Sequence, residues 1–320
     1  MPDQQINLLC IDGGGFKGLS ALVIIRKIME LVDHNCPPKP CEFFRMIGGT
    51  GTGGLIAIML GRLEMTVDEC MEEYVALHAT IFKKSNFWNS KQVRYDYAAL
   101  EAGLKRLLRQ KRMDEQTLLK NSSEQACKVF VTATSAGSCT LALLSSYYRR
   151  RGVSELYDHA RILDAVKITI ATATGSGPVS IGPTGRQFLD GETGANNPVF
   201  TLWEEAESMF SGGGPLEQYL NCMVSVGCGI RSLERFSTSP ARLARLLANI
   251  ATETEETAKR FQHARHAIFD KGIYHRFSAP SVGDIALDDF EDKLSIIQMT
   301  DSYIDSKEFQ DRMSLCESRM

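Results

Sequence analysis

The sequence predicts an α/β fold in which buried strands alternate with helices. An apolar run over residues 7–11 leads into a glycine-rich segment, residues 12–18, and then into an amphipathic helical pattern over residues 19–32. A second apolar run, closing on residues 44–47, leads into another glycine-rich turn before a helix to about residue 63. With 43% hydrophobic residues among 320, the chain can bury one large core.

The rest of the chain continues this alternation. Further helices are predicted over residues 65–82, 96–108, 163–172, 240–270 and 294–304. Thr66 and Asp96 stand where N-caps are needed. Further strands are predicted over residues 128–133, 141–144, 187–191 and 222–227, of which the first two would extend the central sheet.

We expect a single domain, because no low-complexity linker separates the two halves of the chain. Residues 1–320 would form that domain, with a core over about 6–230 and a C-terminal helical region over about 231–320 packed on it.

The charge pattern excludes nucleic acid as a partner. A net charge of −3 arises from 36 basic and 39 acidic residues that are mixed along the chain. The first apolar run lacks a basic leader and is too short for a signal-peptide core or a membrane span. We therefore expect a cytoplasmic protein without a transmembrane segment, for which transient membrane contact remains open; the oligomeric state is not predicted.

Cysteine and histidine spacing indicates neither a metal site nor a disulfide framework. The nine cysteines are scattered singly without a C-x-x-C pair, so we expect most of them to be reduced and buried. Of six histidines, only His263 and His266 share a predicted helical face, and such a pair on a basic helix is more often solvated than ligating. No metal and no cofactor is predicted.

The first glycine-rich segment reads Asp-Gly-Gly-Gly-Phe-Lys-Gly and opens a helix. Free backbone N–H groups at such a junction can hold an anion or a developing oxyanion. Gly13, Gly15 and Gly18 also fit the dinucleotide-binding fingerprint. That alternative requires an acidic residue at the end of the second strand, where this chain has Gly48 and Gly49, so we disfavour it.

The second turn has the frame of a nucleophile elbow. In α/β-hydrolase-like folds the pattern G-x-S-x-G carries the nucleophile on a tight strand–turn–helix corner. Residues 49–53 read Gly-Thr-Gly-Thr-Gly, so the frame is intact and its central residue, Gly51, has no side chain. Further along, Asp190 places a carboxylate at the end of a short apolar run; a turn aspartate that caps its own backbone is the alternative.

The order of these motifs, with Asp190-Gly191 and the later Asn196-Asn197-Pro198, resembles the patatin-like phospholipase family, and its fungal, soluble members most. The resemblance runs from Leu8 to about Ile304 and includes a strand over residues 274–277. It implies a three-layer α/β/α fold with a central, mostly parallel sheet. It also implies a Ser-Asp dyad that cleaves acyl esters. Carried over by position, the oxyanion loop is Gly13, Gly14 and Gly15, the base is Asp190 and the nucleophile position is Gly51.

Gly51 departs from that family pattern, and glycine offers no oxygen for acyl transfer. Thr50 and Thr52 flank the corner, but we expect their hydroxyls to point away from its apex. Residues 173–180, 192–193 and 225–229 also differ from the family pattern. Because a single engineered substitution would not alter four segments, we favour a natural departure over a laboratory knock-out.

Three hypotheses for function remain. The leading one is a repurposed enzyme that cyclises or isomerises a hydrophobic carbonyl compound, with Asp190 as acid/base and Gly13–Gly15 as donors. The second is a lipid acyl hydrolase with an engineered serine-to-glycine change. The third is a non-catalytic protein that binds a lipid or a hydrophobic small molecule. Gly175 and Ser176 would line the pocket. Lys17 could meet an anionic headgroup at its mouth, although we favour the alternative of an exposed lysine.

Overall fold

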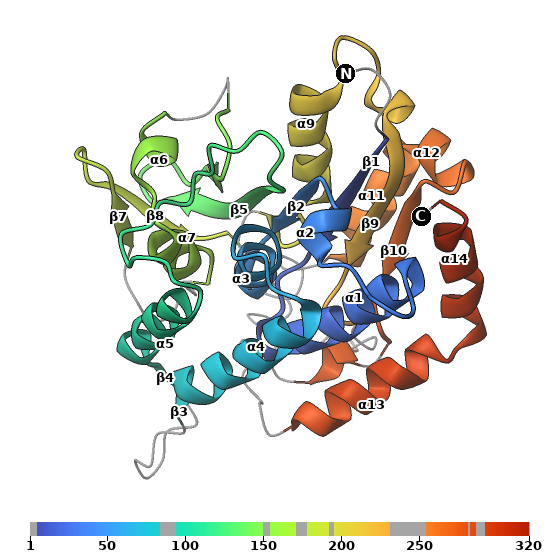
Figure 1. Ribbon diagram of the computed structural model, residues 1–320, viewed down its shortest axis with the longest axis horizontal. Coiled ribbons are helices and arrows are strands. Elements are labelled where there is room, and N and C mark those ends of the chain that lie inside the picture. The colour runs from blue at the N-terminus through green and yellow to red at the C-terminus, as the bar shows by residue number, and fades with distance from the viewer. Residues whose placement is uncertain are drawn as a thin grey trace, which may run out of the picture.

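The computed structural model describes residues 5–83, 94–149, 154–170, 178–191, 195–230, 254–280, 282–285 and 292–319. Their main sheet has the strand order β10-β9-β1-β2-β5-β8-β7, and β6 also pairs with β5 (Figure 1). The five parallel strands are β1 (Ile6–Ile11), β2 (Met46–Gly49), β5 (Lys128–Ser135), β9 (Leu220–Val226) and β10 (Tyr274–Phe277). The antiparallel strands are β6 (Leu141–Ser145), β7 (Val179–Ile181) and β8 (Arg186–Asp190).

Helices cover both faces of this sheet, so the fold is the three-layer α/β/α arrangement that was expected. Alternate residues of β1 point to opposite layers: Leu9 and Ile11 into one core cluster, Leu8 and Cys10 into the other. The first layer contains α1 (Gly18–Val32), α3 (Gly51–Ala57), α4 (Val67–Ile81), α5 (Tyr97–Gln110), α7 (Ile162–Thr169), α13 (Lys293–Ile304) and α14 (Lys307–Glu317). The second contains α9 (Val199–Phe210), α11 (Glu255–Ala264) and α12 (His266–Asp270).

Shorter elements complete the described chain. They are α2 (Pro40–Phe43), α6 (Ser154–His159), the 3₁₀ turns Gly15–Lys17, Leu216–Gln218 and Val282–Asp284, the π-turn Ile58–Arg62, and a hairpin of β3 (Phe82–Lys83) and β4 (Arg94–Tyr95). None of the described helices is both long enough and apolar enough to span a bilayer.

Local sequence signals place several helix starts where they were predicted. The Thr66 hydroxyl accepts from the Glu69 N–H at 3.1 Å, and the Glu69 carboxylate accepts from the Thr66 N–H at 3.1 Å, which makes a reciprocal capping box. The Asp96 carboxylate accepts from the Ala99 N–H at 2.9 Å. Both predicted N-caps are confirmed.

The C-terminal third differs from expectation. Where we predicted one long helix to residue 270, the described part holds two, α11 and α12, broken at Arg265 (φ −122°, ψ 38°). At the break the Arg265 guanidinium lies 4.6 Å over the Trp203 ring, and the chain turns towards β10. The expected single helix is therefore wrong there. A final helix, α14, was not predicted, and β10 makes the C-terminal region part of the sheet as well as a cover for it.

The corner between β2 and α3 packs on the backbone of β1 without a side chain in between. A Cβ added at Gly53 would collide with the carbonyl oxygens of Ile11 and Asp12, and one added at Gly49 would collide with the backbone of Gly53 itself. Glycine at these positions therefore brings α3 against the end of β1.

We expect Gly53→Ala to destabilise the protein by about 1–3 kcal/mol, because the clashing atoms are backbone and cannot rotate away. The free energy of unfolding in urea measures this. Gly137→Ala is the control, since a Cβ there meets nothing within 4 Å. Equal stability of the two variants would contradict the close packing at Gly53.

Candidate active site

The β2–α3 corner holds Gly51 in a conformation that side chains disfavour. Thr50 is extended (φ −128°, ψ 150°), and Gly51 follows with φ 53°, in the left-handed region. A strained residue at a strand-to-helix turn is the arrangement that exposes a nucleophile in hydrolase elbows. The geometry of an elbow is thus present at a residue that has no side chain.

The first glycine loop carries backbone donors at the start of a helix. Gly15 has φ 59° and opens the 3₁₀ turn that continues into α1. The N–H of Gly13 already donates to the carbonyl of Asn196 at 3.1 Å. The N–H groups of Gly14 and Gly15 precede the first helical hydrogen bond, and within the described part of the chain no backbone acceptor is bonded to them, so they are the loop donors that can meet a ligand.

Neighbouring side chains hold this loop in place. The Tyr74 hydroxyl donates to the carbonyl of Gly15 at 2.5 Å, and the Phe16 ring stacks on the Tyr74 ring. On the opposite side, Gly14 packs directly on Cys228, whose thiol donates to the Asp12 carbonyl at 3.2 Å. The loop is therefore preorganised by α4 and by the segment after β9.

Sheet register places Asp190 at the glycine corner. Strand β6 pairs with residues 130–134 along one side of β5. The other side pairs with β2 at residues 128–131 and then with β8 at residues 133–135, so β2 and β8 lie end to end there. β2 runs parallel to β5 and ends at Gly49 opposite Val131, whereas β8 runs antiparallel and ends at Asp190 opposite Ala133. The carboxyl ends of β2 and β8 therefore face each other across Thr132.

Thr132 joins these two strand ends. Its hydroxyl donates to the Thr50 hydroxyl at 2.5 Å, and a Cβ on Gly191 would collide with Thr132. The next residue but one, Thr134, donates from its hydroxyl to the backbone carbonyl of Asp190 at 2.7 Å. Asp190 itself is only 3% exposed, so its carboxylate lies in the interior and not at the surface.

The other predicted site residues fall into three groups. Thr50 is buried and points at Thr132, while the buried Thr52 hydroxyl has no hydrogen-bond partner among the described residues. Lys17 is 4% exposed and donates to the Gly283 carbonyl at 3.1 Å, so the alternative of an exposed lysine is wrong. Gly175 and Ser176 lie outside the described residues.

A buried ion pair beside the loop was missed. Arg276 on β10 donates to Asp12 at 2.6 Å, to Glu255 at 2.5 Å and to the Ser225 hydroxyl at 2.9 Å. Burial raises the pKa of Asp12 to about 6, against the lowering effect of Arg276. The available signal was an arginine followed directly by Phe277 in a segment expected to be a strand, because a charge buried in a sheet needs a partner.

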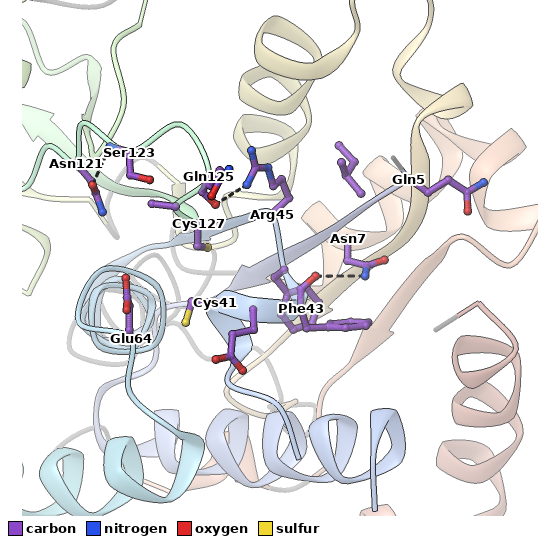
Figure 2. A pocket seen from close by; sticks show the side chains of 14 residues that line it. Gln5, Asn7, Cys41, Phe43, Arg45, Glu64, Asn121, Ser123, Gln125 and Cys127 are labelled. Atoms are coloured by element: carbon purple, nitrogen blue, oxygen red, sulfur yellow. Dashed lines mark hydrogen bonds between the residues drawn. The ribbon is translucent and has the colours of Figure 1, made fainter. Parts of the chain in front are cut away.

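A cavity of about 730 Å³ lies at the amino ends of the parallel strands, opposite the glycine corner (Figure 2). Residues at the starts of β1 and β5 and around α2 line it, among them Asn7, Cys41, Arg45 and Cys127. Arg45 there is already bonded to the carbonyls of Glu124 and Gln125. Neither this cavity nor the second described one, about 290 Å³ beside β6, is lined by Gly51, Asp190 or the glycine loop.

The mostly parallel sheet, the glycine loop and the elbow-like corner define an α/β fold with the strand–turn–helix corner that α/β-hydrolase folds share. A family model described as patatin-like phospholipase matches residues 9–203, and the chain belongs to that family.

Known relatives share its sequence over most of this chain. The chain is 27% identical to calcium-independent phospholipase A2-gamma of Oryctolagus cuniculus over 324 residues, which cover 95% of this chain and 38% of that protein. The Homo sapiens protein of that name is 26% identical over 314 residues, 92% of this chain and 38% of its own length. This chain thus spans well under half of these relatives.

Among solved structures, VipD from Legionella pneumophila aligns over 99% of this chain and 67% of its own, with a TM-score of 0.44 and 11% identity.

The two corner threonines should respond oppositely to loss of their hydroxyls. We expect Thr50→Val to cost about 1–2 kcal/mol, since Thr132 loses a buried partner, and Thr52→Val to be neutral or stabilising by up to about 1 kcal/mol. Urea unfolding of the two variants side by side measures the difference. A larger loss for Thr52→Val than for Thr50→Val would show that the Thr52 hydroxyl is bonded.

Proposed function

We propose that this patatin-family protein carries out acid/base chemistry on a hydrophobic carbonyl compound instead of serine-dependent hydrolysis. Asp190 is the general acid/base, and the N–H groups of Gly14 and Gly15 stabilise an enolate or alkoxide. The reaction is a cyclisation or an isomerisation, and no cofactor takes part. A cytoplasmic location, with transient membrane contact, remains our expectation.

The observation that carries this proposal is the meeting of β2 and β8 end to end on β5. It brings the buried Asp190 to the corner whose apex, Gly51, would carry the nucleophile in the family pattern. A carboxylate next to fixed N–H donors suits proton transfer beside a carbonyl, and such donors contribute about 3 kcal/mol to transition-state stabilisation.

The neighbours of Gly51 do not restore a hydrolytic nucleophile. The Thr50 hydroxyl is bonded to Thr132, and no histidine or second carboxylate is bonded to the Thr52 hydroxyl among the described residues. A serine or threonine nucleophile needs an adjacent base to become reactive. We therefore infer that this corner accommodates part of the ligand and that the Thr52 hydroxyl makes a polar contact with it.

If Asp190 transfers the proton, Asp190→Asn should lower turnover by about 100-fold or more while the fold is kept. The assay incubates the purified chain with a panel of polyketide and terpenoid carbonyl compounds and analyses products by liquid chromatography and mass spectrometry. Asp301→Asn, at an exposed position of α13, is the matched control and should behave as the parent protein. Equal product from the Asp190 variant and the parent would refute the role of Asp190.

A second candidate, a lipid acyl hydrolase that has lost its serine, is favoured by the left-handed Gly51 and by relatives named phospholipase A2. In that case Gly51→Ser should create esterase activity on p-nitrophenyl acyl esters and lysophospholipids.

Gly51→Ala is the matched control, because both side chains bear the same strain of about 1–2 kcal/mol at positive φ and only serine supplies an oxygen. Activity of the serine variant alone would favour the hydrolase. Inactivity of both would favour a site that has moved away from hydrolysis. Stabilisation by lysophospholipid without turnover in any variant would indicate a binding protein.

A further inference from the structure

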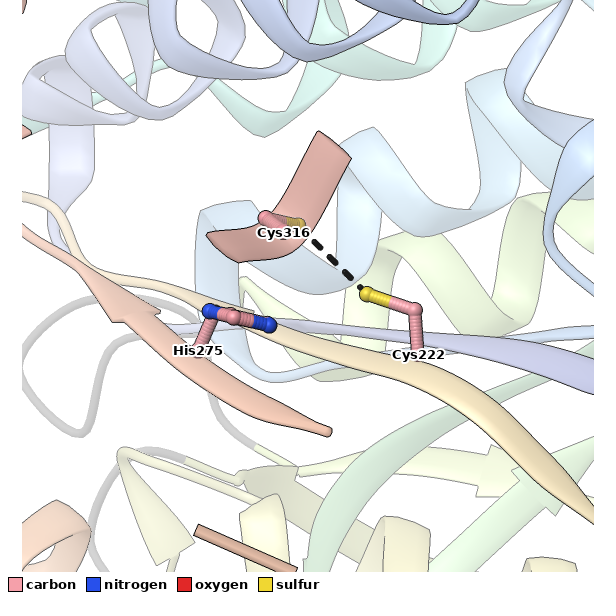
Figure 3. A group of neighbouring side chains, drawn as sticks. All are labelled: Cys222, His275 and Cys316. Carbon is pink, nitrogen blue, oxygen red and sulfur yellow. Dashed lines mark hydrogen bonds between the residues drawn. The ribbon is translucent and has the colours of Figure 1, made fainter. Parts of the chain in front are cut away.

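Three potential metal ligands from distant segments converge beneath the C-terminal helix (Figure 3). Cys222 lies on β9, His275 on β10 and Cys316 on α14. One ligand atom of each lies within 4.8 Å of the others, and all three side chains are buried. We propose that they bind a Zn²⁺ ion that fastens α14 to the edge of the sheet.

The sulfur geometry fits such an ion. The Sγ atoms of Cys222 and Cys316 are 3.5 Å apart. Two thiolates on a tetrahedral zinc, each with a bond of about 2.3 Å, lie about 3.8 Å apart, whereas a disulfide needs about 2.0 Å. A shift of a few tenths of an ångström therefore admits zinc, while a disulfide requires a larger movement.

One ring nitrogen of the histidine is bonded to the backbone, which leaves the other for a metal. His275 Nε2 lies 3.0 Å from the carbonyl of Gly272. With the proton on Nε2, the ring donates to this carbonyl and keeps a lone pair on Nδ1 for the metal. Metal-binding histidines commonly donate their second ring N–H to a carbonyl or carboxylate in this way.

The ligand set selects zinc over the hard cations. Two sulfurs and one nitrogen suit a borderline metal, whereas Mg²⁺ and Ca²⁺ prefer oxygen ligands, which this group lacks. Binding replaces the two thiol protons, which leave to solvent, so the bound unit is a neutral zinc dithiolate.

The charged side chains around the group are compatible with a neutral zinc dithiolate. Two guanidinium groups approach β10: Arg312 donates to the Arg276 carbonyl at 3.0 Å and Arg319 to the Lys271 carbonyl at 2.5 Å. A cation with neutral ligands would add net positive charge near these guanidinium groups, which is unfavourable. Zinc bound by two thiolates adds no net charge, so the guanidinium groups do not oppose its binding.

This site departs from the prediction of no metal. Separations of 53 residues (275 − 222) and 41 residues (316 − 275) resemble no zinc motif, and only the register of β9 and β10 with the docking of α14 unites the ligands.

The test uses the full chain, reduced, stripped with a chelator and reloaded with Zn²⁺ alone or with Co²⁺ as a spectroscopic probe. We expect one zinc per chain by elemental analysis and a thiolate-to-cobalt charge-transfer band. At a free zinc concentration about 100 times the Kd, the melting temperature should rise by about 5 °C.

Cys316→Ala and Cys222→Ala should bind zinc at least about 100-fold more weakly and lose the melting shift. Cys70→Ala, at an equally buried cysteine on α4 outside the group, should keep both. The proposal is overturned if the reduced parent chain binds no zinc, or if Cys316→Ala binds it as the parent does. None of these readouts depends on turnover, so the result is independent of the proposed function.

Discussion

The whole site depends on direct contact between the backbone of α3 and the end of β1. Gly53 lies against the carbonyls of Ile11 and Asp12, and Gly49 lies against Gly53. Since no side chain separates these elements, the glycine loop after β1 and the corner after β2 are fixed relative to each other. Catalytic geometry must be held within fractions of an ångström, and this backbone contact leaves no side-chain rotamer that could change the spacing.

A second constraint is the unequal length of the strands around β5. Because β2 stops at Gly49 while β5 continues, the free edge of β5 accepts β8 from the opposite direction. Thr132, which lies between the two strand ends, contacts both of them. The side of β5 beyond the end of β2 thus becomes the place where the Asp190 carboxylate meets the glycine corner. This place is at the carboxyl end of β2, and α/β folds generally bind ligands at the carboxyl ends of their strands.

Much of this arrangement could be predicted from the sequence because its signals are local. Apolar runs identified β1, β5 and β9, and residues such as Thr66 and Asp96 marked helix starts. The glycine patterns identified both turns, although the occupation of the Gly13 N–H by Asn196 could not be foreseen, since it depends on how the segment before α9 docks.

What could not be predicted depends on contacts between distant parts of the chain. The pairing of Asp12 with Arg276 joins positions 264 residues apart, and no spacing pattern describes it. Thr132 looked like an ordinary strand residue, because its role follows only from two strands ending beside it. At the helix break, the Arg265 guanidinium meets the Trp203 ring of another helix, a contact that no local pattern contains. Sequence periodicity contains none of this information.

The edge strand β10 makes the two ends of the polypeptide mutually dependent. Its side chains alternate, so that Arg276 reaches Asp12 in one layer while Phe277 packs on Phe309 of α14 in the other. During synthesis, the first loop therefore leaves the ribosome long before its buried counter-charge does. Until β10 has been synthesised, Asp12 lacks this arginine partner, and the nascent chain should mature as one late, cooperative unit and not segment by segment.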